Sequence, residues 1–196
     1  MNAFTITLAV VVSYFFGTIP SAIAVARSKG VDITSFGSGN PGASNVGRAL
    51  GTRYFVLVMF MDAAKGAVPT AAMLGDRHVA YLCGAAAVLG HVFPVTRRFK
   101  GGKGVATGAG VVLVLHPFIL LAAFGSWLLL SKVTGKASIG SIVAVPVVVG
   151  GFLIAGVPAW EVWSIIGIGL LVEARHLGNI KRLLSGSENR LDSPAP

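Results

Sequence analysis

Long apolar stretches alternate with shorter polar stretches along the chain. The apolar stretches cover residues 4–26, 54–74, 78–95, 105–130, 139–156 and 159–172. About 20 apolar residues in a helix suffice to cross the hydrocarbon core of a bilayer. The stretches are continuous, unlike the alternating segments of a membrane β-barrel. The pattern therefore predicts an all-α integral membrane protein. Its first stretch is a retained span, because it lacks the basic head and cleavage site of a signal peptide.

One apolar stretch, residues 105–130, is interrupted by His116 and Pro117. If this pair marks a tight turn, the stretch forms two short segments and the chain crosses the membrane about seven times. The basic segments, which hold every lysine and arginine except Lys65 and Arg77, then lie on one side of the membrane. Because such residues accumulate on the cytoplasmic side, we expect the amino terminus outside and the carboxyl terminus in the cytoplasm. A single continuous span would put the tail on the side opposite residues 97–103.

Composition supports the membrane assignment. Of the 196 residues, 54% are hydrophobic and only 12% are charged, with a mean hydropathy of +0.79, whereas soluble domains carry roughly 25% charge. The net charge of +9 indicates loops that face anionic lipid and an anionic substrate, and no nucleic-acid partner. The single cysteine, Cys83, excludes an internal disulfide. We expect one membrane domain, residues 1–185, and a polar, disordered tail, residues 186–196.

The segment from Ser35 to Arg48 is rich in glycine and small polar residues and contains no carboxylate. Glycines let the backbone approach a ligand closely, and hydroxyls, amides and a guanidinium supply hydrogen-bond donors suited to phosphate. The candidate ligand-binding residues here are Ser35, Ser38, Gly39, Asn40, Asn45 and Arg48. The segment is therefore interpreted as an anion site; the alternative is an ordinary flexible linker between two helices.

A second polar segment, residues 99–107, reads Phe-Lys-Gly-Gly-Lys-Gly-Val-Ala-Thr and leads into an apolar helix. Free amides at a helix start attract anions, and Lys103 adds a full positive charge. It is not a Walker A loop, since Gly104 follows Lys103 where that loop has Ser or Thr. The candidate residues are Gly101, Gly102, Lys103, Gly104 and Thr107. The neighbouring residues Arg97, Arg98 and Lys100 are better explained as a membrane anchor.

The third polar segment, residues 175–183, contains His176, Asn179 and Arg182. On a helix, His176 and Asn179 lie on one face because they are three residues apart. A basic helix resting on lipid explains the same residues equally well. Polar residues within the spans are also candidates, since they are costly in a membrane. These supporting candidates are Asp62 and Lys65, which are spaced to pair, together with His91 and Ser141.

Together these segments resemble the bacterial membrane glycerol-3-phosphate acyltransferases that use acyl phosphate, the PlsY family. The matching strings are Ser35–Arg48, Asp62-Ala-Ala-Lys-Gly66, His91-Val-Phe-Pro94, residues 99–107, Ser138-Ile-Gly-Ser141 and residues 176–183 with Gly186 and Glu188. They occur in order over nearly the whole chain. The resemblance implies transfer of an acyl group from acyl phosphate to the 1-hydroxyl of sn-glycerol 3-phosphate in the bacterial inner membrane, with the site on the cytoplasmic side. It implies neither a metal nor another cofactor.

The resemblance also suggests roles for individual residues. Ser35, Arg48 and Lys103 hold phosphate in this hypothesis, while His176 and Asn179 orient the second phosphate or the attacking hydroxyl. Either His176 or the departing phosphate then takes the hydroxyl proton. Two alternative functions fit the sequence less well. An anion transporter would favour an internal repeat and a site near the midplane, and a soluble-type acyltransferase would show a His-x4-Asp motif.

Overall fold

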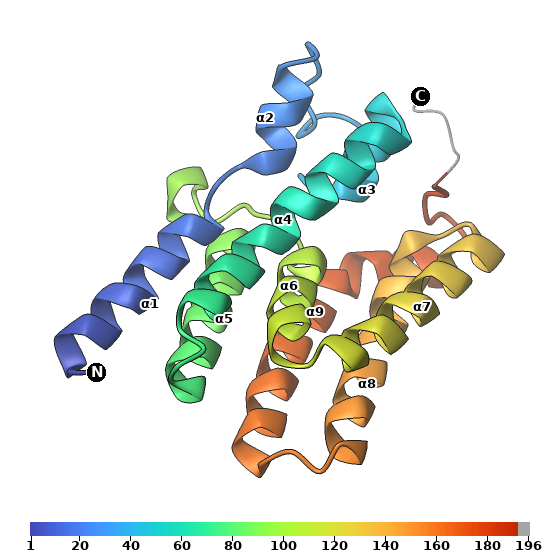
Figure 1. The fold of residues 1–196 in the computed structure, drawn as a ribbon. Coiled ribbons are helices and arrows are strands. Elements are labelled where there is room, and N and C mark those ends of the chain that lie inside the picture. Colours follow the sequence, from blue (N-terminus) through green and yellow to red (C-terminus); the bar gives the residue numbers. More distant parts are fainter. Residues whose placement is uncertain (192–196) are drawn as a thin grey trace. The chain divides into compact units, whose positions relative to one another are not determined.

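The computed structural model describes residues 1–191, and these form helices joined by turns and loops, with no strand among them (Figure 1). The helices are α1 (Ala3–Gly17), α2 (Ser21–Arg27), α3 (Ala43–Leu50), α4 (Thr52–Ala72), α5 (Arg77–Val92), α6 (Val105–Leu115), α7 (Pro117–Thr134), α8 (Ala137–Ile154) and α9 (Ala159–Leu184), with a 3-10 turn η1 (Val95–Arg97) after α5. The described residues form two compact units, 1–115 and 116–191, and each is described by itself.

At two places a proline marks the point where a continuous apolar stretch divides into two helices, whereas Pro69 and Pro146 lie inside α4 and α8. The first apolar stretch breaks before Pro20 into α1 and α2, and the fourth breaks at His116 so that Pro117 opens α7. Proline has no N–H to donate and its ring excludes the preceding helical turn. The expected turn at His116 and Pro117 is therefore confirmed. The expected loop from Ser35 to Arg48 is a loop only as far as Gly42, since α3 begins at Ala43.

Five helical segments are long and apolar enough to cross a membrane, with α1 and α2 counted together and α5 extended through η1. The other three are α4, α7 and α8. Helix α6 is apolar but shorter, and α9 carries Glu161, Glu173 and Arg175 within its length. Many large apolar side chains lie on the outside, such as Phe118 at 84% and Ile154 at 91% exposure. Such surfaces are stable in contact with lipid tails. The count of about seven crossings stays a prediction.

In the first unit, small residues bring two helices into close contact. Helix α4 packs along α6, and α1 packs along α5 (Figure 1). A methyl group on Gly66 would collide with the backbone carbonyl of Thr107, and one on Gly110 would collide with the carbonyl of Ala63. Helices in membranes associate largely through such close packing of small residues. The α4–α6 contact fixes where α6 begins, and therefore where the glycine-rich turn before it lies.

A tyrosine in α1 connects that helix to the chain segment after α5. The Tyr14 hydroxyl donates a hydrogen bond to the Phe93 carbonyl at 2.7 Å and accepts one from the Val95 N–H at 3.1 Å. Both backbone groups lie where α5 has ended, so neither has a helical partner. The contact fixes the turn that leads toward Gly101.

The second unit is a pair of helical hairpins, with α8 packed between α7 and α9 (Figure 1). His116, at the start of the unit, lies 3.0 Å from the buried Glu161 carboxylate of α9. The His116 ring also lies edge-on to the ring of Phe152, with centroids 4.5 Å apart. Pairing with histidine satisfies a carboxylate that burial would otherwise make costly.

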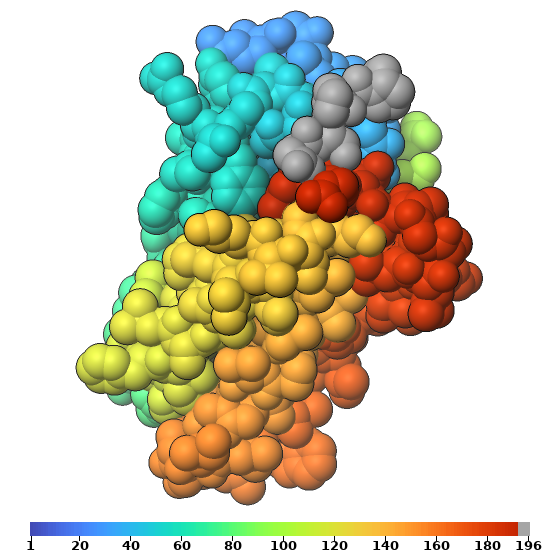
Figure 2. All heavy atoms as spheres, turned by 90° about the vertical axis from the view of Figure 1, so that its right-hand side faces the viewer, coloured from blue at the N-terminus to red at the C-terminus, as the bar shows by residue number. Residues whose placement is uncertain are grey.

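The first residues of the predicted disordered tail make defined contacts. The Leu191 N–H donates to the Gly135 carbonyl at 2.8 Å, and the Glu188 side chain is buried. Figure 2 shows this segment, in red, against the gold atoms of the α7–α8 turn. The segment 186–191 therefore packs on its own unit. Residues 192–196 of the predicted tail lie outside the described residues.

Candidate active site

The glycine-rich segment is organised around the buried amide of Asn45, on α3. Its nitrogen donates to the carbonyls of Ile33, at 3.2 Å, and Phe36, at 2.9 Å. Its oxygen accepts from the Ser38 N–H at 3.3 Å and from Arg48 at 3.0 Å. All four hydrogen-bonding positions of the amide are thus used within the segment. Asn45 shapes the turn and orients the Arg48 guanidinium.

The other candidates in this segment surround that amide. Arg48 also donates to the Ser38 hydroxyl at 3.3 Å, and the same hydroxyl accepts from the Asn40 N–H at 3.4 Å. The Ser35 side chain is exposed and donates to the Asp32 carbonyl at 3.2 Å. Gly39 has a φ of +66°, a conformation that a side chain would strain. Ser38, Asn40 and Arg48 therefore form one half-buried donor cluster beside the exposed Ser35.

The Gly-Gly-Lys turn follows a backbone reversal that is unusual for its residues. Arg98 and Phe99 both have positive φ values, 51° and 62°. The Phe99 N–H donates to the Pro94 carbonyl at 2.9 Å, and the Arg97 guanidinium donates to the Lys100 carbonyl at 2.6 Å. Such conformations persist only where the surroundings hold them. The reversal brings the chain back over the end of α5.

Beyond the reversal, Gly101 and Gly102 are buried and Lys103 is half-buried. Gly104 has a φ of +87°, and α6 begins at the next residue, so Lys103 stands at the approach to the helix start as the sequence predicts. Thr107 is fully buried on α6, and its hydroxyl has no hydrogen-bond partner among the described residues. Lys103 is the cation that this turn presents.

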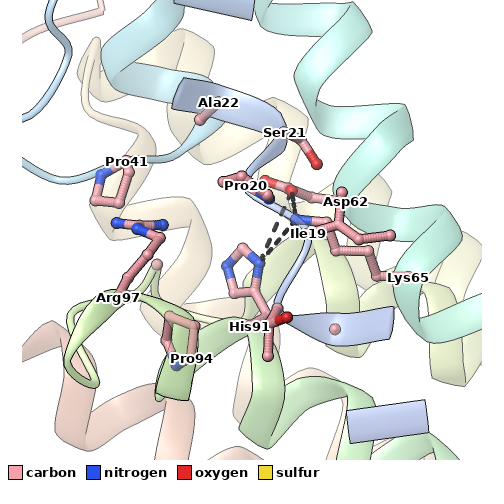
Figure 3. Close-up of a pocket in the computed structure, with 13 residues that line it drawn as sticks. Ile19, Pro20, Ser21, Ala22, Pro41, Asp62, Lys65, His91, Pro94 and Arg97 are labelled. Carbon is pink, nitrogen blue, oxygen red and sulfur yellow. Dashed lines mark hydrogen bonds and ion pairs between the residues drawn. The ribbon is translucent and has the colours of Figure 1, made fainter. Parts of the chain in front are cut away.

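A buried polar cluster lies next to the Gly-Gly-Lys turn (Figure 3). Lys65 contacts Asp62 at 2.6 Å and the Nδ1 atom of His91 at 3.5 Å, and the three side chains are at most 9% exposed. The expected Asp62–Lys65 pair is confirmed. The cluster borders a small cavity that Pro41 of the glycine-rich segment and Gly102 of the turn also line. The first unit therefore brings its two predicted polar segments to one cavity.

In the second unit, the third polar segment is helical, as expected, and forms the end of α9. His176 is 2% exposed, and its Nδ1 lies 2.8 Å from the Val172 carbonyl. A carbonyl oxygen only accepts hydrogen bonds, so Nδ1 carries the proton of the neutral ring. The Nε2 atom is then the basic nitrogen. This tautomer suits a general base.

Glu188 joins two of the predicted residues and was not among the predicted site residues. Its carboxylate accepts hydrogen bonds from Asn179 at 2.6 Å and Arg182 at 2.8 Å. Burial alone would raise the pKa of Glu188, but the hydrogen bond from Asn179, the nearby Ser138 hydroxyl and the charged hydrogen bond from Arg182 together hold it below its ordinary value. The Ser138 hydroxyl lies near the carboxylate but makes no hydrogen bond of good geometry with any of the described residues.

The remaining candidate, Ser141, contributes to packing between helices. Its hydroxyl donates to the Ala137 carbonyl at 2.9 Å and accepts from the Trp127 indole at 3.1 Å. Ser141 thus links α7 to α8 near the turn that contacts the carboxyl-terminal segment. The sequence did offer a signal for Glu188, because Glu188 follows residues 176–183 in the strings that resemble the family. In the structure Gly186, with a φ of +72°, turns the chain back after α9.

Comparison with known proteins assigns the family. The model of the family described as glycerol-3-phosphate acyltransferase matches residues 7–186. A glycerol-3-phosphate acyltransferase from Aquifex aeolicus is 43% identical over 188 residues, covering 92% of this chain and 96% of the relative. A glycerol-3-phosphate acyltransferase from Syntrophotalea carbinolica is 44% identical over 199 residues, covering 97% of this chain and 98% of the relative.

Solved structures agree with this assignment. Crystal structures of PlsY (YgiH), an integral membrane glycerol 3-phosphate acyltransferase, are 41% identical and cover 95% of each chain. The TM-score is 0.91 for the glycerol 3-phosphate form and 0.89 for the lysophosphatidic acid form. The apolar helices and these matches make this a multi-pass membrane protein. The chain belongs to the glycerol-3-phosphate acyltransferase family.

Proposed function

We propose that the chain transfers a fatty acyl group from acyl phosphate to the 1-hydroxyl of sn-glycerol 3-phosphate. The products are lysophosphatidic acid and inorganic phosphate. The observation that carries the proposal is the set of donor-rich, carboxylate-free segments in the first unit, Ser35–Arg48 and residues 99–107. Donors without a competing carboxylate suit phosphate. Both reactants carry phosphate if the donor is acyl phosphate.

The residues divide into two groups in this proposal. Ser35, Arg48 and Lys103 bind phosphate, and the Asn45 amide holds the Arg48 guanidinium in position through its 3.0 Å contact. Ser38, Gly39 and Asn40 complete the first segment, and Gly101, Gly102, Gly104 and Thr107 complete the second. From the second unit, His176, Asn179 and Arg182 bind the acceptor in this proposal. Ser141 supports them.

The chemistry needs no covalent enzyme intermediate. The acceptor oxygen attacks the acyl carbon, the bond from that carbon to the phosphate oxygen breaks, and phosphate leaves with the bonding electrons. His176 Nε2 takes the hydroxyl proton, which is consistent with the proton fixed on Nδ1 by the Val172 carbonyl. Phosphate is a good leaving group, so the protein contributes orientation and charge stabilisation. In the rival version the departing phosphate takes the proton.

We further propose that the site lies on the cytoplasmic side of the bacterial inner membrane. The basic residues of the two donor-rich segments and of the α9 end favour that side. An interfacial site also suits the reactants, because the acyl chain of the donor stays in lipid while glycerol 3-phosphate arrives from water.

The test of the donor uses purified full-length protein in detergent with radiolabelled glycerol 3-phosphate. Palmitoyl phosphate is supplied in one reaction and palmitoyl-CoA in another, each with a chelator present. We expect labelled lysophosphatidic acid only with palmitoyl phosphate. Product formed from palmitoyl-CoA alone would overturn the acyl-phosphate donor while leaving the family assignment intact.

Lys103 is tested by substitution with alanine. The variant is expected to insert into the membrane and keep its thermal stability but to turn over at a small fraction of the wild-type rate. Lys132→Ala is the matched control, since Lys132 lies on α7 outside the proposed site. Full activity of the Lys103 variant would remove this side chain from phosphate binding.

A further inference from the structure

Asp62, Lys65 and His91 form a buried cluster whose contacts extend to the Gly-Gly-Lys turn. Lys65 Nζ lies 2.6 Å from Asp62 Oδ1 and 3.5 Å from His91 Nδ1, and that nitrogen is 3.8 Å from Asp62 Oδ1. The Lys65–Asp62 pair already neutralises itself, so it does not need the third group. An ammonium only donates, so His91 Nδ1 accepts and its Nε2 carries the ring proton when Lys65 is charged. The histidine ring is thereby oriented by the ion pair.

The oriented ring is in direct contact with the turn. The Gly102 N–H donates to the His91 carbonyl at 3.1 Å. A methyl group on Gly102 would collide with the His91 ring, with Nε2 the nearest atom, and one on Gly101 would collide with the carbonyls of His91 and Val92. The glycine pair is therefore required for close packing on His91. The sequence pattern instead predicts both glycines as candidate ligand-binding residues.

A small polar cavity lies beside the cluster. Its polar lining includes Asp62, Lys65, Arg97 and the buried Ser21 (Figure 3). The Ser21 hydroxyl is 1% exposed and has no partner among the described residues, as expected where a water completes the hydrogen bonding.

The turn itself needs external support. Arg98 and Phe99 hold left-handed conformations just before it, which cost energy for residues with side chains. Lys103 follows Gly102 directly, so any movement of Gly102 on the His91 ring moves the Lys103 backbone as well. The covalent link makes the position of Lys103 depend on His91.

We propose that Asp62, Lys65 and His91 are positioning residues: the ion pair fixes the His91 ring, and the ring supports the turn that presents Lys103 to phosphate. The inference rests on the proposed role of Lys103. It explains why two charged side chains in α4 and a histidine in α5 lie within apolar helices, where such residues are costly. In this proposal the three residues act through the turn and are assigned no contact with the substrates.

The first experiment measures the turn without using activity. Lys103→Cys is introduced alone and together with His91→Ala, and the rate of modification by a charged, membrane-impermeant thiol reagent is measured in detergent. The parent protein gives the background from the buried Cys83. His78→Ala, at the other end of α5 and exposed, is the matched histidine control. We expect His91→Ala to change the labelling rate severalfold and His78→Ala to leave it unchanged.

The second experiment uses kinetics with whichever acyl donor the wild type accepts, so that a wrong donor assignment does not affect it. His91→Ala is expected to raise the KM for glycerol 3-phosphate or lower kcat by roughly 10- to 100-fold, as small misplacements of binding groups do. His91→Gln is expected to recover part of the activity that His91→Ala loses. Gly102→Ala is expected to be impaired, and adding His91→Ala to it is expected to restore activity above the level of Gly102→Ala alone.

These outcomes separate positioning from general stability. The inference would be overturned if His91→Ala left the labelling rate of Lys103→Cys unchanged and a folded His91→Ala protein had wild-type kinetics. So would a Gly102→Ala, His91→Ala double variant no better than Gly102→Ala alone. If Gly102→Ala does not fold, the labelling comparison still decides the question. An active Lys103→Ala protein would contradict the proposed role of Lys103, while the labelling result would still report whether His91 fixes the turn.

Discussion

Asn179, on the last turns of α9, donates a 2.6 Å hydrogen bond to Glu188, which lies beyond the end of that helix. Both side chains are at least nine-tenths buried. The bond therefore folds the carboxyl-terminal segment back against the helix that carries His176. It connects a predicted acceptor-binding residue to a segment that the sequence alone marks as tail.

The Glu188 carboxylate makes the protein sensitive to acid. Its pKa is lowered in the folded protein from an ordinary value of 4.5, so its contribution to stability is present above that value and is lost as the pH falls through the folded pKa. We expect the melting temperature of the wild type in detergent to fall below about pH 4.5 partly for this reason.

Glu188→Gln removes the stabilising contribution of the Glu188 charge. The melting temperature of this variant is therefore expected to fall less steeply than that of the wild type as the pH is lowered. Asp32→Asn is the control. Hydrogen bonds from Thr34 lower the pKa of Asp32 too, but that carboxyl is fully exposed, so solvent screens its effect. An acid limb in Glu188→Gln as steep as that of the wild type would contradict the stabilising role of the Glu188 charge.

Asn45→Asp tests whether this amide organises the glycine-rich segment. The change removes the two donors that reach the Ile33 and Phe36 carbonyls. Each buried acceptor left without a partner costs roughly 1–3 kcal/mol, so we expect a lower melting temperature and a raised KM for glycerol 3-phosphate. Asn189→Asp makes the same chemical change in the second unit. Equal effects of the two substitutions would argue against a special role for Asn45.

Gly66→Ala tests the close approach of α4 and α6. The added methyl would collide with the Thr107 carbonyl, and overpacking of this kind costs roughly 1–3 kcal/mol. Gly125→Ala, on α7, is the matched control because nothing lies within 4 Å of the added methyl. The control is expected to be neutral or slightly stabilising, since alanine favours helix more than glycine does. Thermal unfolding of both proteins decides the point.

Lys65→Met would leave the Asp62 carboxylate buried without its partner. Removing one member of a buried ion pair costs roughly 3–5 kcal/mol, so we expect poor accumulation or a strongly lowered melting temperature. The double variant Asp62→Asn, Lys65→Met removes both charges and is expected to recover most of the stability. Its KM is expected to stay raised, because the His91 ring is no longer oriented. A single variant as stable as the double would contradict the pairing.

His176→Ala tests the general base. If Nε2 takes the hydroxyl proton, the wild-type pH–rate profile has an acidic limb that the variant lacks. The measurement is kcat/KM against pH for both proteins, under conditions where each remains folded. A slower variant with an unchanged profile would assign proton transfer to the departing phosphate and leave His176 as a hydrogen-bonding group.

Much of the fold follows from local signals. Continuous apolar stretches gave most helices, and a proline that cannot continue a helix explains the break before α7. The Asp62–Lys65 pair and the helical position of His176 beside Asn179 follow from spacing on a helix. These features depend on residues a few positions apart, so the sequence displays them directly.

The features that were missed depend on distant residues. The Lys65–His91 contact joins α4 to α5 across 26 positions, and the packing of Gly102 on His91 requires the backbone reversal at Arg98 and Phe99. Nothing in the local pattern marks arginine and phenylalanine for positive φ. Glu188 was assigned to a disordered tail because polar composition gives no sign of a carboxylate returning to its own helix.

The Tyr14 hydroxyl bonds to backbone groups about eighty positions further along the chain, and this separation bears on how the protein is made. Helix α1 leaves the ribosome long before Phe93 and Val95 are synthesised, so Tyr14 first lies in the bilayer without these hydrogen-bond partners. The first unit can close only after α5 has been inserted. Formation of the Gly-Gly-Lys turn is therefore a late event in biogenesis, in which the earliest helix is joined to one of the last elements of its unit.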